Sequence, residues 1–144
     1  MIWVRDAIGG SLLLNLVVIF TSIVILFFAG IMAYSKAYKA KNKIIEVIES
    51  YENYDETVAG VISEDLKLAG YRNANREQIE AKCGTDNANE STYFYCIYED
   101  ANSAEEGFSY EVVTFVQFDF PVIGNLLVFP VKGETRTLGK VYNY

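Results

Sequence analysis

Residues 12–34 read LLLNLVVIFTSIVILFFAGIMAY, an almost wholly apolar run of 23 residues. A helix rises about 1.5 Å per residue, so this run reaches about 35 Å, more than the roughly 30 Å of a bilayer's hydrocarbon core. No charged residue stands between Asp6 and Lys36. The run therefore predicts a retained membrane-spanning helix. The alternative is a cleaved secretory signal, whose apolar region is shorter, about 7–15 residues.

The helical pattern continues beyond the apolar run, because neither Pro nor Gly occurs between Tyr34 and Gly60. One set of side chains recurs at a mean spacing of about 3.5 and is expected on one helix face: Tyr34, Ala37, Lys41, Ile44, Ile48 and Tyr51. We expect a single helix over 11–52, embedded in lipid over 12–34 and amphipathic beyond. Two helices with a break near Ser35 are the alternative.

Charge divides the chain into two parts. The 144 residues carry a formal net charge of −7 and no His. Residues 1–43 hold five bases and one acid, whereas residues 44–144 hold seven bases and 18 acids. The acidic surplus argues against a nucleic-acid partner, because phosphate needs a basic face. The lack of His excludes Ser-His-Asp and Cys-His nucleophile systems and any His-ligated metal site.

Two short helices are expected after the long one. Asp55 is a good N-cap for a helix over 56–69, and Gly70 is a good stop. Its apolar stripe consists of Val58, Ile62, Leu66 and Ala69. Asn75 with Gln78 resembles a capping box for a helix that runs to about Lys82 and ends at Gly84.

Three strands are expected in the second half, over 92–98, 109–120 and 126–138. The middle strand places alternate residues on one face: Tyr110, Val112, Thr114, Val116, Phe118 and Phe120. Pro130 predicts a bulge or an edge position. The connections are a polar loop over 84–91, an acidic loop over 99–107 and a turn over 121–125. A sheet this small is marginal alone, so we predict an α+β fold whose antiparallel sheet packs on the outer half of the long helix.

Cys83 and Cys96 flank the polar loop. In an exported domain they would pair and close a loop of about a dozen residues, which contributes about 2–3 kcal/mol in the chain-entropy treatment. In a cytoplasmic domain they would be two half-buried thiols. We expect the disulfide on condition that the domain is exported.

Residues for chemistry are scarce. The sequence holds no G-x-S-x-G, Walker, H-E-x-x-H or Gly-rich dinucleotide motif. Adjacent acids could serve a glycosidase or a Ca²⁺ site, but they lie in stretches typical of solvated faces or loops: Glu64/Asp65, Glu99/Asp100 and Glu105/Glu106. We therefore expect no catalytic residues, no metal and no cofactor.

The residues before the apolar run form a short leader, MIWVRDAIGG over 1–10, and Ser11 follows it. Asn15 is a lone polar residue near the start of the run. A polar group in lipid costs on the order of 1–3 kcal/mol unless it finds a partner. Asn15 therefore indicates contact between helices, or else lies at headgroup level.

A short charged leader that ends in Gly10, then Ser11 and a long apolar helix, resembles the class III signal of type IV pilins and pseudopilins. The chain is most similar to the TadE-like branch, the minor pilins of tight-adherence (Flp-type) pilus systems. Two further stretches resemble that branch, the helix pair NKIIEVIESYENYDETVAGVISEDLKLAGY over 42–71 and the closing strands FVQFDFPVIGNLLVFPVKGETRTLG over 115–139.

The resemblance implies that a prepilin peptidase cuts between Gly10 and Ser11. Residues 53–144 would then form an extracytoplasmic head, and Asn15 would contact another subunit. The implied partners are membrane lipid, other pilin-like subunits, the peptidase and the assembly platform of a pilus or secretion filament. The family commonly has Glu where this chain has Asn15, which favours a minor subunit because Asn cannot cancel the charge of a neighbour's terminal amine.

Orientation and function each have a competing interpretation. Four Lys follow the apolar run, whereas Arg5, offset by Asp6, precedes it. The positive-inside tendency alone would place the head in the cytoplasm as a regulatory domain, and the resemblance implies the opposite, which we expect. The rival function is a single-pass anchored ectodomain for binding or sensing that does not polymerise.

Overall fold

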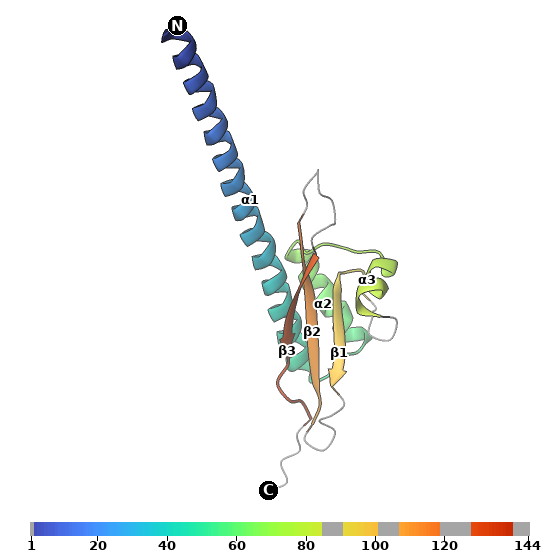
Figure 1. The fold of residues 1–144 in the computed structure, drawn as a ribbon. Helices are drawn as coiled ribbons and strands as arrows, with labels where there is room; N and C mark the ends of the chain where they lie inside the picture. Colours follow the sequence, from blue (N-terminus) through green and yellow to red (C-terminus); the bar gives the residue numbers. More distant parts are fainter. Residues whose placement is uncertain (1, 85–90, 101–106, 119–127, 140–144) are drawn as a thin grey trace.

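The computed structural model describes residues 2–84, 91–100, 107–118 and 128–139, with side chains from Gly9 onward (Figure 1). Within these ranges the chain forms three helices followed by three strands. It is the expected α+β arrangement of a long N-terminal apolar helix and a small antiparallel sheet. The turn expected over 121–125, and most of the loops expected over 84–91 and 99–107, lie outside the described residues.

Helix α1 runs without interruption over Ile2–Tyr51, 50 residues. It begins nine residues before the expected start at residue 11, and it has no break near Ser35. Gly9 and Gly10 each cost about 1 kcal/mol relative to Ala inside a helix, but neither prevents the helix from continuing. From Gly9 on, α1 is long and apolar enough to cross a membrane. Figure 1 shows its first half projecting beyond the rest of the molecule.

The face of α1 that packs on the sheet differs from the expected stripe. Ala37, Ile44 and Ile48 are buried as expected, but Tyr34 and Tyr51 are each 54% exposed. The remaining buried positions are Ala40 and Val47. Ala37 and Ala40 lie at the contact between α1 and the sheet, where their small side chains let the helix come close to the strands. The two tyrosines point away from the sheet.

Helix α2 spans Glu56–Leu68. The Asp55 carboxylate accepts the backbone N–H of Val58 at 2.8 Å, which is the expected N-cap. At the other end the Tyr71 N–H donates to Leu66 O at 2.9 Å and the Gly70 N–H to Lys67 O at 3.1 Å. This is a Schellman motif, and Gly70 has the positive φ of 66° that it requires. Ala69, expected on the buried stripe, is instead the exposed C-cap.

Helix α3 spans Arg76–Cys83, one residue beyond the expected end. The Asn75 N–H donates to Gln78 Oε1 at 3.4 Å, as in a capping box. Gly84 follows the helix with a φ of 78°, so the chain leaves it in a conformation that favours glycine. Ile79 and Cys83 form its buried face.

The sheet consists of β1 (Tyr95–Asp100), β2 (Ser109–Gln117) and β3 (Val128–Glu134). In the described part of the chain their order is β1-β2-β3, and both pairs are antiparallel. Strand β1 starts later than expected, because Tyr93 forms a bridge with Asn73 instead. Strand β3 ends four residues before the expected 138, and β2 ends at Gln117 rather than 120. Pro130 lies in the edge strand β3.

Both faces of the sheet are covered. The expected face of β2, with Val112, Thr114 and Val116 buried, packs toward α1 and α2. The opposite face, which the sequence interpretation left unassigned, forms a second cluster beneath α3. Its buried members are Ile79, Cys83, Phe94, Cys96, Val113 and Phe115. Covering of both faces explains why nearly every residue of β2 is buried.

Candidate functional site

The apolar half of α1 has no protein neighbour in the described chain. Every side chain from residue 9 to residue 28 is exposed, including large ones such as Phe20 and Phe27. An apolar surface this large indicates contact with lipid or with other helices. This part of α1 therefore fits a membrane span, and among its described residues the helix has buried side chains only from Ala37 onward, where it packs on the sheet.

The three N-terminal residues singled out by sequence lie on this exposed half. Gly10 and Ser11 are both inside α1, and a Cβ added to Gly10 would meet no other atom within 4 Å. The Asn15 side chain is exposed and takes part in none of the described hydrogen bonds. The hydroxyls of Thr21 and Ser22, by contrast, donate to carbonyls one turn back, each at 2.8 Å.

Cys83 and Cys96 form a disulfide that joins α3 to β1, with a Cα–Cα distance of 5.5 Å. Both residues are buried in the cluster beneath α3. The bond therefore fixes the short helix α3 to the sheet. It lies far along the chain from the apolar run and takes no part in the pocket described next.

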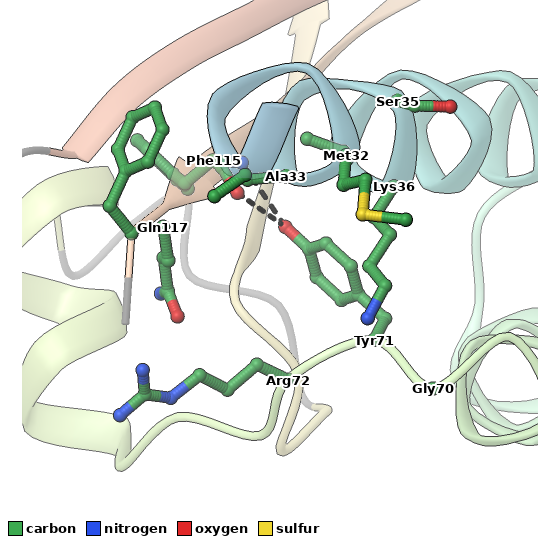
Figure 2. A pocket seen from close by; sticks show the side chains of 12 residues that line it. Met32, Ala33, Ser35, Lys36, Gly70, Tyr71, Arg72, Phe115 and Gln117 are labelled. Atoms are coloured by element: carbon green, nitrogen blue, oxygen red, sulfur yellow. Dashed lines mark hydrogen bonds between the residues drawn. The ribbon is translucent and has the colours of Figure 1, made fainter. Parts of the chain in front are cut away.

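A cavity of about 570 Å³ lies where α1 meets the head, and Figure 2 shows it from close by. Its described lining comes from three places: α1, the segment that follows α2, and the end of β2. The lining side chains are those of Ala29, Met32, Ala33, Ser35, Lys36, Ala37, Tyr71, Arg72, Phe115, Gln117 and Phe118, with Gly70. Sequence reasoning did not anticipate this pocket.

Tyr71 builds one wall of the cavity. Its hydroxyl donates to Phe94 O at 2.8 Å and accepts the Phe115 N–H at 3.1 Å, and Figure 2 shows the contacts with Phe115. The β1–β2 ladder ends one residue earlier, at the pair Tyr95–Thr114. The Tyr71 hydroxyl therefore connects the backbones of β1 and β2 one residue beyond the last pair of the ladder. Burial raises the pKa of Tyr71 to about 12.

The cavity is basic although the head is acidic. Among the described lining residues, Lys36 and Arg72 are cations and no carboxylate is present. The side-chain oxygen of Gln117 is buried and accepts no hydrogen bond from the residues that the structure describes. No local motif connects these three residues, which stand far apart in the sequence, so only the fold brings them together.

Most of the acidic residues singled out from the sequence can be placed in the structure. The described residues contain no group of three or more Cys, Asp or Glu that could hold a metal ion. Glu64, Glu99 and Asp100 are exposed, and Asp65 lies 3.8 Å from the Lys43 ammonium. The pair Glu105/Glu106 lies outside the described residues.

Comparison with known proteins gives no relative. No protein-family model, curated protein or solved structure matches the chain. Its function is therefore argued from its own residues and architecture.

Proposed function

We propose that the chain is a membrane-anchored pilin-like subunit of the TadE-like kind that takes part in assembly of a type IV or tight-adherence pilus, or of a related secretion filament. The supporting observation is the form of α1, a single helix that is bare and apolar over its first half and packed on an antiparallel sheet over its second. Such a helix can be held in lipid first and then covered by the helices of other subunits.

The N-terminal residues give the proposal its processing step. Gly10 and Ser11 lie on the exposed part of α1, where glycine, which has no side chain, leaves the backbone open. A prepilin peptidase would cut between them and release residues 1–10. Asn15, exposed at the fifth position after the cut, would accept a hydrogen bond from a neighbour's terminal ammonium but would leave its charge in place. We expect a minor subunit to tolerate this uncancelled charge better than the subunit that repeats along a filament.

The first experiment tests the cut. The full chain is expressed in cells with and without an active prepilin peptidase, and its terminus is read by mass spectrometry of membrane fractions. We expect a chain that starts at Ser11 only where the peptidase is active. Gly10→Leu should block the cut, whereas Gly9→Leu, an equal change one residue away, should slow it far less. An intact terminus in every case would count against the proposal.

The rival function, an anchored ectodomain for binding or sensing, predicts no cut and a monomer. Chemical cross-linking in membranes before and after peptidase expression separates the two functions, because only the subunit should give peptidase-dependent adducts with other pilin-like chains. Orientation is tested separately with Lys67→Cys, an exposed position on α2. An impermeant maleimide should label it from outside the cell, and protection would place the head in the cytoplasm.

A further inference from the structure

We propose that the end of the sheet formed by Phe118, Val128 and Phe129, here called the sheet end, enters the lipid of the membrane that α1 crosses. Its partner is the layer where headgroups meet acyl chains. The inference rests on membrane anchoring, one part of the proposed function, and not on cleavage or polymerisation. Three observations carry it: the direction of the strands, the depth that they reach along α1, and the exposed apolar surface at their end.

Strand β2 runs toward the bare half of α1. In the middle of the strand, the Thr114 hydroxyl donates to the carbonyl oxygen of Ala37 at 2.9 Å. Just beyond the strand, the Phe118 ring lies against α1 at Gly30, where an added Cβ would stand 3.3 Å from the ring. Strand β3 begins at the same place, because its first residue pairs with the last residue of β2. The sheet end is therefore the part of the sheet closest to the apolar run.

The sheet end reaches α1 inside the apolar run. Gly30 precedes Tyr34, where the run ends, by about one helical turn, which corresponds to about 6 Å along the axis. Protein surfaces that lie on a membrane enter the boundary of headgroups and acyl chains to a similar depth, about 5–10 Å. The rings of Tyr34 and Tyr38, which stack at 6.2 Å, are typical of that boundary. A bilayer that covers the apolar run therefore also reaches the sheet end.

The surface of the sheet end is apolar. Phe129 is 52% exposed, and its ring packs edge to face on that of Phe118 with 6.2 Å between the centroids. Between Gln117 and Lys132 the sequence carries one charged residue, Asp119. A single acidic residue near the interface is far less costly than a charge at the centre of the bilayer. An exposed aromatic ring in a stretch with so little charge fits shallow entry into lipid.

The sheet end is continuous with the bare part of α1. All side chains from residue 9 to residue 28 are exposed, and the first partly buried residues after them are Ala29 and Gly30. Phe118 lies against the second of these. Lipid around the bare part would thus meet the sheet end without any second chain. This continuity favours lipid as the occupant, and contact with a second copy of the chain is one outcome of the test.

The test places one tryptophan at a time in the full-length chain, in nanodiscs loaded with a single chain each. Every variant carries Trp3→Phe, which removes the natural tryptophan. Lipids brominated near the headgroup end of their acyl chains quench a tryptophan that they touch. We expect them to quench Phe129→Trp about as strongly as Phe28→Trp, whose position is 62% exposed within the apolar run.

Tyr51→Trp is the matched control, because Tyr51 is 54% exposed at the opposite end of α1. Brominated lipid should leave its fluorescence unchanged. Lipids brominated near the methyl end of their chains should quench Phe129→Trp less than the first lipids do, since the sheet end enters only the boundary layer.

If Phe28→Trp is quenched while Phe129→Trp behaves like Tyr51→Trp, the anchor stands and the lipid contact of the sheet end is overturned. Emission of Phe129→Trp that shifts to shorter wavelength only in discs with several chains would assign the surface to a second copy and equally overturn the lipid contact. Absence of quenching in Phe28→Trp would instead overturn the anchor, and the proposed function with it.

Discussion

The Thr114 hydroxyl, in the middle of the central strand, donates a hydrogen bond of 2.9 Å to the carbonyl oxygen of Ala37 in α1. Thr114 is fully buried and Ala37 nearly so. The bond therefore ties the sheet to α1 just beyond the end of the apolar run. It is a buried polar contact between the sheet and the helix, so it fixes the position of the strand along the helix as well as its distance.

Replacement of this threonine should loosen the seam. Thr114→Val keeps the shape but removes the hydroxyl, so we expect the free energy of unfolding to fall by about 1–2 kcal/mol. Urea titration of the full chain in detergent micelles measures the change. Thr57→Val, at an exposed position of α2, is the matched control and should have a much smaller effect. Equal losses in the two variants would show that the hydrogen bond contributes nothing particular.

Two glycines should respond to alanine in opposite directions. A Cβ at Gly133 in β3 would lie 2.8 Å from Lys41 Cδ and 2.9 Å from Ile45 Cδ1, so α1 or its side chains must shift. Both atoms belong to flexible side chains that can rotate aside, so we expect Gly133→Ala to cost only about 1 kcal/mol. Gly60 lies inside α2 with open space around it, and Gly60→Ala should add about 1 kcal/mol through helix propensity. The same urea titration compares both variants, and a stabilising Gly133→Ala would contradict the close packing of α1 on β3.

Removal of the disulfide should weaken the head. The bond closes a loop with a sequence separation of 13, which corresponds to about 3 kcal/mol in the chain-entropy treatment. We expect the double variant Cys83→Ala/Cys96→Ala to lose about that much. A reductant should destabilise the wild type and leave the double variant unchanged. If the reductant leaves the wild type unchanged as well, the bond does not contribute to stability in the purified protein.

Alkaline pH should destabilise the fold in part through Tyr71. Its pKa rises from 10.0 to about 12 through burial, so the fold prefers the neutral phenol. The resulting stability is present below pH 10 and is lost as the pH rises toward 12. Tyr71→Phe should therefore make the free energy of unfolding depend less steeply on pH between 10 and 12. It should also lower stability at pH 7 by about 1–3 kcal/mol, because the Phe115 N–H loses its acceptor.

Tyr95 and Tyr110 should keep the free energy of unfolding dependent on alkaline pH even in the Tyr71→Phe variant. Burial raises the pKa of each of these tyrosines as well. Tyr71→Phe should thus reduce the slope without removing it. If the free energy of unfolding depends on pH as steeply in Tyr71→Phe as in the wild type, the pKa of Tyr71 is not raised by the fold.

Local chemistry made several parts of the fold predictable from sequence. Asp55 and Gly70 bound α2 because a carboxylate cap and a left-handed glycine act on their immediate neighbours. Cys83 and Cys96 are the two cysteines of the chain, so the choice of pair was settled once a bond was assumed. The length of the apolar run fixed the character of α1 in the same way.

Tertiary contacts account for what the sequence did not reveal. The expected stripe on α1 included Ala37, Ile44 and Ile48, which are buried, but it also included Tyr34 and Tyr51, which are exposed, and it left out the buried Ala40 and Val47. Thr92 and Tyr93 were assigned to a strand, but they pair with the segment after α2 rather than with the sheet. No sequence pattern predicted the basic cavity, because its lining residues come from segments that only the fold brings together.

The uninterrupted course of α1 has a mechanical consequence. A helix turns by about 100° and advances about 1.5 Å for each residue, and α1 joins the bare segment to the sheet without a change of conformation. An insertion of one residue among the bare positions would therefore swing the sheet about 100° around the helix axis while preserving every contact inside the head. Whatever holds the N-terminal end of α1 therefore also sets the angle at which the sheet lies around the helix axis.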